Sequence, residues 1–490
     1  MNAHLDPTTL TEPASQTSVS ELRGLLERQQ AAFAEDPNPD WPTRKGWLKA
    51  VGTLVDRHAD RFVEAIAADF GHRAHQETRL AELMTARSAI THAKRHTKGW
   101  MKGPRTATPL TFWPGKARVI TQPKGVAGIV SPWNYPLQLA LVPAIAALSA
   151  GNRVMLKPSE LTPRFSEALR VAVEEHFDAD VFTVVTGEVE LATAFTSLPF
   201  DHLFFTGSTA VGKKVGVAAM EKLVPVTLEL GGKSPVILDE TADMELAAQR
   251  ITYGKLLNCG QTCVAPDYLI MPETLVTDMI ARLKTVAQTY FPSLDDNPDL
   301  TTIVSDRHFK RLQELVADAE AKGATVHRPT PQTGEYDLDA LAAQRRMPLT
   351  ILTNVTPEMA VMQEEIFGPL LPIVTAETTD AALNFIAKGE RPLALYWFGN
   401  DAVTRERILN QSISGTAAIN DTTLQVAVDE IPFGGIGASG MGAYHGRASF
   451  DTFSHQKGVF IQSKLSATKW LMPPYRRRSN WLISFLNRWV

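Results

Sequence analysis

Residues 125–157 have the sequence GVAGIVSPWNYPLQLALVPAIAALSAGNRVMLK. The first six residues and the last six form short apolar runs with several β-branched or long aliphatic side chains, which is typical of buried strands. The run between them is apolar and long enough for a helix. A strand, a helix and a second strand in this order predict two parallel strands joined by a crossover helix.

The same alternation continues towards the C-terminus of this stretch. After NRVMLKP come TPRFSEALRVAVEEHF, VFTVVTG, ELATAFTSL, HLFFTG, STAVGKKVGVAAMEKL and VPVTLELGG, which alternate between helix-like and strand-like patterns. We therefore expect an α/β fold with a mostly parallel sheet and helices on both of its faces.

The flanking regions extend this interpretation. A second α/β series begins near residue 235 with SPVILD, and continues with a helix over 242–258, the strand YLIMP and helices near 274–288 and 306–322. Strands are expected near PLTIL and LLPIV. On the N-terminal side, residues 21–100 predict helices with long polar faces, and residues 116–130 predict a hairpin followed by a strand.

The composition is that of an ordinary globular protein and argues against a nucleic-acid-binding one. The chain has 490 residues, which corresponds to about three domains, and 44% of its residues are hydrophobic. Its net charge is −4, from 49 basic and 53 acidic residues. Because nucleic-acid-binding domains are usually basic, small molecules are the expected partners.

Cysteine content and apolar runs indicate the compartment. The two cysteines, Cys259 and Cys263, suit a reducing environment and are too few for a disulfide scaffold or a four-thiolate zinc site. The first twenty residues lack the apolar core of a signal peptide. The longest apolar stretch, from Pro136 to Ala150, is shorter than a membrane span. We expect a cytoplasmic protein without a metal.

The C-terminal tail has a different character. After Pro474 the chain reads YRRRSNWLISFLNRWV, which places one apolar face on a basic helix. That face consists of Trp481, Leu482, Phe485, Leu486 and Trp489. Such a helix can lie in a membrane interface. The favoured alternative is a C-terminal helix that docks on the body of the protein or on a partner subunit.

Three residues in turns or at strand ends are candidates for chemistry. Cys263, in NCGQTCVAPDY, follows small and polar residues that can expose a thiol, whereas Cys259 is expected to be a packed thiol. Glu229 ends an apolar strand in LELGGKSP, where burial can raise the pKa of a general base. Asn134, in SPWNYP, offers amide donors that can stabilise an oxyanion. Each residue alone also fits a purely structural role.

Other motifs indicate a nucleotide. In FFTGSTAVG, residues 204–212, a strand runs through Gly207 and Ser208 into a helix, and Gly212 lies in its first turn. The N-terminus of a helix suits a phosphate group, although the spacing matches neither a P-loop nor GxGxxG. In KPSE, Lys157 and Glu160 follow another strand and can bind ribose hydroxyls.

The six motifs SPWNYP, KPSE, FTGSTAVG, LELGGKSP, GQTC and EIFGP occur in this order, and together they resemble the aldehyde dehydrogenase superfamily. The resemblance covers about residues 20–460. PFGGIGASGMGAYHGRASFDTFSH (432–455) and PPY (473–475) are similar to the class 3 branch, and ITYGKLLNCGQTCVAPDY is most similar to bacterial coniferyl aldehyde dehydrogenases. Cys259 departs from this pattern, because a small residue such as Ser or Ala is expected there.

The resemblance implies the domain organisation. It predicts a polar, disordered tail over 1–20 and a Rossmann-like NAD-binding domain over 21–228, interrupted near 116–127 by an oligomerisation hairpin. An α/β catalytic domain would occupy 229–424. Residues 425–490 would return to the small β oligomerisation arm and form the C-terminal tail. Relatives in the class 3 branch suggest a homodimer.

The resemblance also assigns roles to residues at matching positions. Cys263 would be the nucleophile, Glu229 the general base and Asn134 the oxyanion donor. The residues that would contact the dinucleotide are Trp133, Lys157, Ser208, Glu365 and Phe367. The residues that would line the aldehyde pocket are Tyr135, Thr262 and Phe433.

The implied reaction is oxidation of an aldehyde to a carboxylic acid through a thiohemiacetal and a thioester on Cys263. NAD is the expected cofactor, with NADP accepted as a second one. An aromatic or cinnamyl aldehyde such as coniferyl aldehyde is the favoured substrate. A medium-chain or long-chain aliphatic aldehyde stays open, as do a CoA-acylating enzyme and a non-catalytic protein on the same fold.

Overall fold

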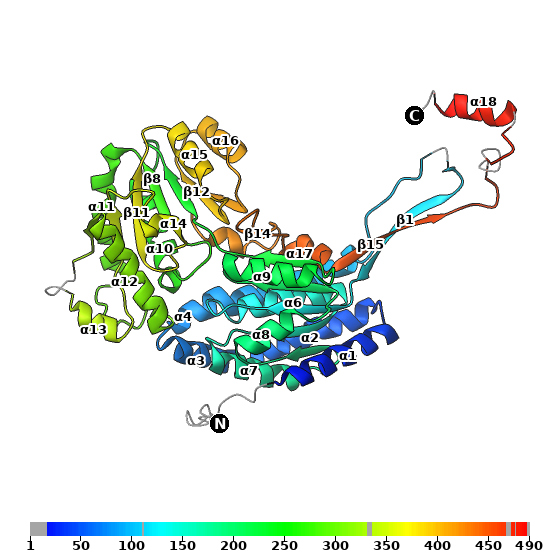
Figure 1. Ribbon diagram of the computed structural model, residues 1–490, viewed down its shortest axis with the longest axis horizontal. Coiled ribbons are helices and arrows are strands. Elements are labelled where there is room, and N and C mark those ends of the chain that lie inside the picture. The colour runs from blue at the N-terminus through cyan, green and yellow to red at the C-terminus, as the bar shows by residue number, and fades with distance from the viewer. Residues whose placement is uncertain (1–16, 110–111, 331–335, 467–471, 476, 488–490) are drawn as a thin grey trace.

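The computed structural model describes residues 17–109, 112–330, 336–466, 472–475 and 477–487 (Figure 1). Two sheets, each with its own helices, form the body of the molecule, and a two-stranded arm extends from it (Figure 1). The prediction of an α/β fold with mainly parallel sheets is confirmed.

The first sheet has six strands in the order β14-β6-β5-β2-β3-β4. All neighbouring pairs are parallel except β14 with β6. The strands are β2 (Val126–Val130), β3 (Arg153–Lys157), β4 (Phe182–Val184), β5 (His202–Thr206), β6 (Val226–Glu229) and β14 (Gly440–Met441).

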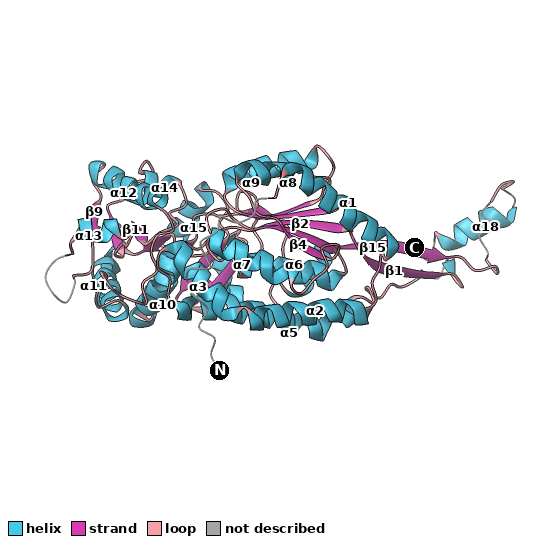
Figure 2. Ribbon diagram, turned by 90° about the horizontal axis from the view of Figure 1, so that it is seen from below, coloured by secondary structure: helices cyan, strands magenta, loops and turns pink. Residues whose placement is uncertain are grey.

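Helices cover both faces of this sheet, as Figure 2 shows with α1, α8 and α9 on one side and α2, α5 and α6 on the other. Helix α6 is buried along its whole length because it lies between strands β2 and β3 and the outer helices α2 and α5. The helices of this part are α1 (Val19–Glu35), α2 (Trp41–Arg57), α3 (Ala59–Phe70), α4 (His75–Thr78), the π-helix η2 (Arg79–Met84), α5 (Thr85–Trp100), α6 (Gln138–Ala150), α7 (Pro163–Glu174), α8 (Val189–Thr196) and α9 (Thr209–Met220).

The second sheet has seven strands in the order β13-β12-β7-β8-β11-β10-β9, and only β9 runs antiparallel to its neighbour. Its strands are β7 (Pro235–Leu238), β8 (Tyr268–Met271), β9 (Thr325–His327), β10 (Thr350–Thr353), β11 (Leu370–Thr375), β12 (Ala394–Phe398) and β13 (Thr416–Ile419). Its helices are α10 (Met244–Leu256), the 3-10 turn η4 (Leu257–Gly260), α11 (Glu273–Tyr290), α12 (Asp306–Ala321), α13 (Leu338–Ala343), α14 (Ala360–Gln363), α15 (Thr379–Lys388) and α16 (Ala402–Gln411). The 3-10 turn η5 (Leu424–Ala427) and α17 (Gly446–Thr452) follow β13.

The arm corrects the expectation of a local hairpin near residues 116–127. Strand β1 (Lys116–Pro123) pairs antiparallel with β15 (Ser454–Ile461), which lies more than three hundred residues further along the chain. Alternating polar and apolar residues indicate that a segment is a strand, but they do not identify its partner. The pattern therefore gave the correct secondary structure and the wrong pairing.

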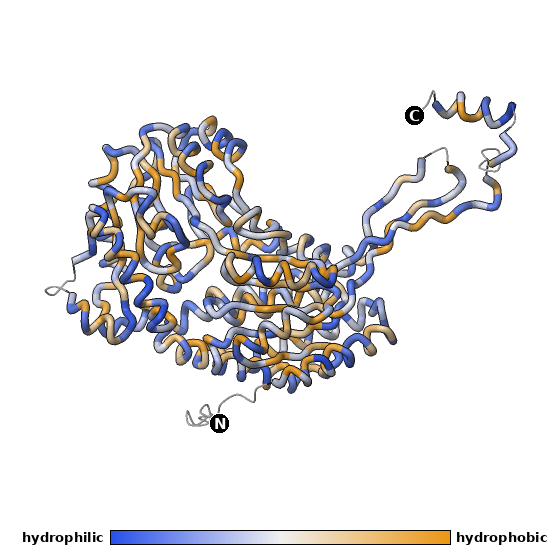
Figure 3. Tube along the Cα trace, viewed as in Figure 1, coloured by the Kyte–Doolittle hydropathy of each residue, from blue (hydrophilic) through white to orange (hydrophobic). Residues whose placement is uncertain are grey.

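Helix α18 (Arg477–Leu486) lies beyond the arm and away from the body (Figures 1 and 3). Trp481, Ile483 and Phe485 are exposed on it. The expected docking on the body of the protein is therefore wrong for the chain as described, while docking on a partner subunit stays a prediction. Trp489 lies outside the described residues. No helix within the described ranges has the length and apolar character needed to cross a membrane.

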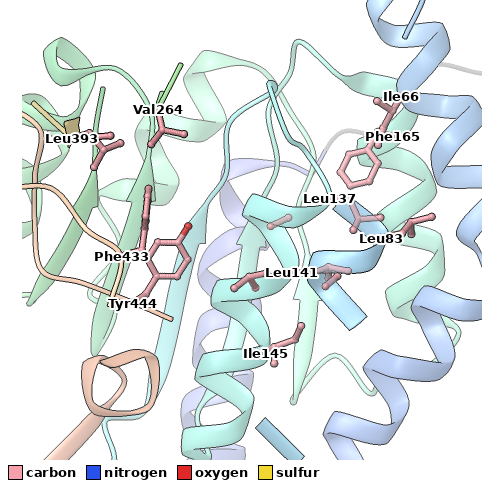
Figure 4. Close-up of a cluster of buried hydrophobic side chains, with 14 of the residues drawn as sticks. Ile66, Leu83, Leu137, Leu141, Ile145, Phe165, Val264, Leu393, Phe433 and Tyr444 are labelled. Carbon is pink, nitrogen blue, oxygen red and sulfur yellow. The ribbon is translucent and has the colours of Figure 1, made fainter. Parts of the chain in front are cut away.

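A continuous apolar core connects the two sheets. It extends from Ile66 and Phe165 on the outer helices, through Leu141 on α6, to Phe433 and Tyr444 (Figure 4). A fully buried side chain of this kind contributes about 1.5–3 kcal/mol to stability. The residues between the two sheets are therefore held by the same packing that stabilises the first sheet.

Candidate active site

The loop before Cys263 has an unusual backbone. Asn258, Cys259 and Gly260 have positive φ angles of 52°, 52° and 74°. A Cβ atom on Gly260 would lie 2.4 Å from the carbonyl oxygen of Gly368, so glycine is required there. Cys259 is fully buried, whereas Cys263 at the end of the loop is partly exposed. The loop therefore separates the two thiols into a packed one and an accessible one.

Gln261 fixes this loop from the inside. Its side-chain Nε2 donates to the carbonyl oxygens of Asn258 at 3.0 Å and Thr302 at 3.1 Å, and its Oε1 accepts from the N–H of Val304 at 2.9 Å. The side chain is fully buried. Because hydrogen bonds in a buried site are costly to leave unmade, the loop has little freedom to change shape.

Asn134 lies against the same loop. Its side-chain Nδ2 donates to the carbonyl oxygen of Gln261 at 3.0 Å. The backbone carbonyl oxygen of Asn134 accepts from Asn258 Nδ2 at 2.9 Å and from Arg73 Nη1 at 3.1 Å. An amide nitrogen carries two hydrogens, and only one is used in the contact with Gln261. The second is left to donate to another group.

Glu229 ends β6, where Thr206 is its neighbour on β5. Both carboxyl oxygens are buried without a side-chain partner, and the backbone N–H of Gly435 faces the carboxyl group. Burial raises the pKa of Glu229 well above its usual range. Burial also raises the pKa of the Cys263 thiol to about 12, and the carboxyl groups of Glu365 and Glu229 act in the same direction.

One cavity of about 920 Å³ lies between the two sheets and brings most of the predicted site residues together. Those that line it are Asn134, Glu229, Cys263, Trp133, Gly207, Ser208, Glu365, Phe367 and Phe433. Such a volume falls in the range of small-molecule and cofactor sites. A partly exposed thiol, a buried carboxyl group and an amide donor therefore share one cavity.

Five predicted residues do not line this cavity. They are Lys157, Glu160, Gly212, Tyr135 and Thr262. Lys157 is buried at the end of β3, and its Nζ donates to Pro158 O at 2.9 Å and to Glu160 Oε2 at 3.1 Å. Tyr135 and Thr262 are buried behind the cavity wall and share a hydrogen bond of 2.8 Å between their hydroxyl groups. Gly212 is buried within α9.

The cavity extends from Cys263 towards the start of α9 and the segment EEIFGP, residues 364–369. Ser208 caps α9, and its hydroxyl accepts from the N–H of Val211 at 3.4 Å. Glu365 has one carboxyl oxygen that is buried without a partner, and burial raises its pKa to about 8. A Cβ atom on Gly231 would lie 2.0 Å from Glu365 Oε2, so a side chain at this position would require the carboxyl group to move.

Several cavity residues were missed by the sequence analysis. Tyr444 packs edge-on against Phe433 with ring centroids 5.6 Å apart, as Figure 4 shows. His308 contacts Trp133 in the same manner at 5.0 Å. Arg311 donates to the carbonyl oxygens of Glu365 and Ile366 and so holds the EEIFGP segment.

Their signals in the sequence differ. Tyr444 lies inside the quoted stretch 432–455, so attention to its aromatic residues would have found it. His308 and Arg311 lie on a helix with ordinary amphipathic spacing, and no motif distinguishes them from its other polar residues.

Relatives of the chain were found among known proteins. It is 48% identical over 461 residues to the "Probable coniferyl aldehyde dehydrogenase" of Pseudomonas aeruginosa, covering 94% of this chain and 95% of that protein. It is 42% identical to the "Coniferyl aldehyde dehydrogenase" of a Pseudomonas species, covering 95% and 96%.

Solved structures show the same fold. The substrate-bound AldH of Staphylococcus aureus superposes with a TM-score of 0.89 at 38% identity, covering 95% of this chain and 99% of that one. An aldehyde dehydrogenase of Mycobacterium tuberculosis complexed with NAD+ gives a TM-score of 0.81 at 27% identity, covering 92% of each chain. The model of the "Aldehyde dehydrogenase family" matches residues 6–459, and the chain therefore belongs to the aldehyde dehydrogenase family.

Proposed function

We propose that this aldehyde dehydrogenase oxidises an aromatic or cinnamyl aldehyde, such as coniferyl aldehyde, to the carboxylic acid with NAD(P). The observation that carries the proposal is the single cavity that holds Cys263, Glu229, Asn134 and an aromatic wall. The two relatives named for coniferyl aldehyde support the choice of substrate.

Cys263 is the nucleophile in this proposal. The thiol, whose pKa burial raises to about 12, releases its proton to solvent, and the resulting thiolate attacks the aldehyde carbon. The oxyanion that forms is stabilised by the free N–H of the Asn134 side chain and by the backbone N–H of Cys263. Each donor of this kind is worth roughly 2.7–4 kcal/mol in the transition state.

Glu229 completes the reaction as a general base. It takes a proton from a water molecule, which then attacks the thioester on Cys263 and releases the carboxylic acid. The N–H of Gly435 faces its carboxyl group, and the remaining lone pairs of the two oxygens can bind a water molecule. A base in this position distinguishes hydrolysis from transfer of the acyl group to CoA, because CoA transfer needs no activated water. A non-catalytic protein has no need for the three groups in one cavity.

The cavity also fits a dinucleotide. Ser208 at the start of α9 provides the positive end of a helix for a phosphate group. Glu365 presents a buried oxygen without a partner, and such an atom is expected to meet a hydroxyl donor. Trp133 and Phe367 lie beside them with ring centroids 5.5 Å apart. NAD(P), when bound here, supplies the acceptor for the hydride that leaves the aldehyde carbon.

The cavity wall favours a planar substrate. Phe433, Tyr444 and Trp133 all line it. Aromatic pairs stack or meet edge to face and gain about 0.5–1.5 kcal/mol beyond the burial of their area. A medium-chain or long-chain aliphatic aldehyde gains the burial alone. Tyr135 supports the wall through Thr262 instead of touching the cavity.

A comparison of kcat/KM tests the proposal. The panel contains cinnamyl, benzyl and C6 to C16 aliphatic aldehydes, each with NAD and with NADP. We expect coniferaldehyde to rank first. A value for dodecanal at least ten times that for coniferaldehyde would establish the aliphatic alternative, and release of acyl-CoA in place of the acid would establish the CoA-acylating one.

The β1–β15 arm is proposed to join two copies of the chain into a homodimer. Its two strands pair only with each other in the part of the chain that the structure describes, so each leaves one edge unpaired. Exposed strand edges readily pair with another chain. Light scattering of the intact protein, compared with a variant shortened in the arm, measures this directly.

A further inference from the structure

Two groups of histidine and carboxylate side chains within the described residues lie close enough together to hold a metal ion. They are His58, Glu175 and His176, and His92, His96 and Glu430, and in each group the possible ligand atoms lie within 4.8 Å of one another. In the second group His92 Nε2 and Glu430 Oε1 already share a hydrogen bond of 2.8 Å. That pair leaves no buried ligand atom of its group without a partner, whereas His176 Nε2 of the first group has none.

The first group contains two buried imidazole nitrogens. His176 Nε2 is shielded from solvent and has no partner, while His58 Nε2 is also shielded and pairs with Glu175 Oε2 at 3.2 Å. Only 12% of the His58 side chain is exposed. Buried polar atoms in folded proteins nearly always have a partner. The unpartnered nitrogen of His176 lies within 4.8 Å of the ligand atoms of His58 and Glu175, which indicates a missing ligand.

The orientation of His176 is that of a metal ligand. Its Nδ1 lies 2.8 Å from the carbonyl oxygen of Ala172, which only accepts, so Nδ1 must carry the proton. The lone pair is then on Nε2, the atom without a partner. Histidines that bind metals typically use their other nitrogen in this way.

The carboxylate completes the geometry. Glu175 Oε2 lies 3.2 Å from His58 Nε2. A tetrahedral zinc ion with bonds of about 2.0–2.2 Å keeps its ligand atoms about 3.3–3.6 Å apart.

We propose that His58, Glu175 and His176 form a structural site for Zn²⁺, with a water molecule as the fourth ligand. Two imidazoles and one carboxylate are ligands that zinc accepts. His58 joins α2 to α3, and Glu175 and His176 follow α7, so the ion would connect two helical segments that pack against each other. None of the three lines the cavity of Cys263.

The test measures metal binding to the full-length chain after treatment with a chelator. Equilibrium dialysis against Zn²⁺ counts the bound ions, and visible absorption of bound Co²⁺ reports tetrahedral coordination. Glu175→Gln and His176→Gln remove one ligand each. Because Glu175 is exposed, its variant is expected to fold even if the histidine variant does not. We expect affinity at least tenfold lower in both variants.

Control variants separate this site from other possible ones. His92→Gln with His96→Gln removes the second group, and Cys263→Ser removes the accessible thiol. Both controls should keep the zinc ion of the first group. Binding that survives Glu175→Gln and His176→Gln unchanged, or no binding to the wild-type chain, would overturn the assignment. Neither result depends on aldehyde oxidation, so the proposed function stands or falls separately.

Discussion

Arg73 and Glu82 form an ion pair in which both side chains are completely buried, with 2.8 Å between Arg73 Nη1 and Glu82 Oε1. Glu82 Oε2 accepts from the N–H groups of Leu137 at 2.7 Å and Gln138 at 3.2 Å. Arg73 donates to the carbonyl oxygen of Asn134. The pair therefore holds both ends of the segment that carries the proposed oxyanion donor.

The same arginine is linked to the loop of the nucleophile. Arg73 Nε lies 3.8 Å from Glu77 Oε2, and Glu77 Oε1 accepts from the N–H of Asn258 at 2.6 Å. Asn258 begins the left-handed turn that leads to Cys263. The buried charges of Arg73, Glu77 and Glu82 thus fix the two loops relative to each other. None of these three side chains lines the cavity.

Glu82→Gln tests this network. Loss of one partner from a buried pair leaves the other charge uncompensated and typically costs about 3–5 kcal/mol. We expect a clear fall in the thermal unfolding temperature and a lower kcat, since Asn134 loses its fixed position. Asp60→Asn is the matched control, because the Arg79–Asp60 pair is exposed and is expected to contribute at most about 1 kcal/mol. Equal effects of the two substitutions would contradict the positioning role.

Substitution of each cysteine tests the assignment of the nucleophile. Cys263→Ala is expected to abolish formation of NADH from any aldehyde, because no other thiol reaches the cavity within the described residues. NAD binding, followed by quenching of tryptophan fluorescence, should persist. Cys259→Ala should keep most activity, since that thiol lies in the apolar core. Wild-type turnover by Cys263→Ala would refute the assignment.

Glu229→Gln keeps the shape of the side chain and removes the base. Formation of the thioester is expected to survive better than its hydrolysis, so one equivalent of NADH per active site should appear in a burst. Intact-mass measurement should then find the acyl group on Cys263. If both half-reactions slow equally and no adduct accumulates, Glu229 does not activate the water.

The pH dependence of hydrolysis follows from the same residue. Burial holds the pKa of Glu229 well above its usual range, so the carboxyl group is protonated at low pH and inactive as a base. The rate of hydrolysis should therefore rise with increasing pH, in the direction that deprotonates Glu229, and the rise should lie at higher pH than for an ordinary carboxyl group. The measurement is the steady-state rate under conditions where hydrolysis limits turnover. The rise should disappear in Glu229→Gln, and a wild-type rate that falls over the same interval would be inconsistent with this role.

The sequence predicted local structure and motifs better than partners in space. The apolar run at 136–150 identified a buried helix, and the structure buries every residue of α6. The local pattern at 116–127 did not show the pairing of β1 with β15, because pairing between distant segments leaves no local signal, and only the family resemblance implied that residues 425–490 return to the arm. For the same reason Glu82 gave no signal, since its partners Arg73, Leu137 and Gln138 meet it only in the fold.

The candidate site shows the same division. Motifs identified the predicted site residues, and nine of these residues line one cavity. Motifs did not show which way a side chain points, so Tyr135 was expected in the aldehyde pocket although it lies behind the wall with Thr262. A resemblance to a family assigns a role to a sequence position. Whether the side chain at that position reaches the cavity depends on the packing around it.

The last prediction concerns the choice between NAD and NADP, and it depends on Glu160. Its Oε2 lies 3.1 Å from Lys157 Nζ, at the end of β3. If the adenine ribose binds there, the carboxylate accepts hydrogen bonds from the two hydroxyls of NAD. NADP places a phosphate at the same point, and two unit charges about 4 Å apart repel by roughly 4 kcal/mol at an effective dielectric constant near 20.

The Lys157 cation and rotation of the partly exposed Glu160 side chain relieve much of this repulsion. We therefore expect a preference for NAD, measured as kcat/KM, and not exclusion of NADP. Glu160→Gln should narrow the difference, mainly through a lower KM for NADP, because the neutral amide still binds hydroxyls and no longer repels the phosphate. Glu167→Gln, on the following helix, is the control and should leave the ratio unchanged. A wild-type preference for NADP, or the same ratio in Glu160→Gln, would show that discrimination lies elsewhere in the cavity.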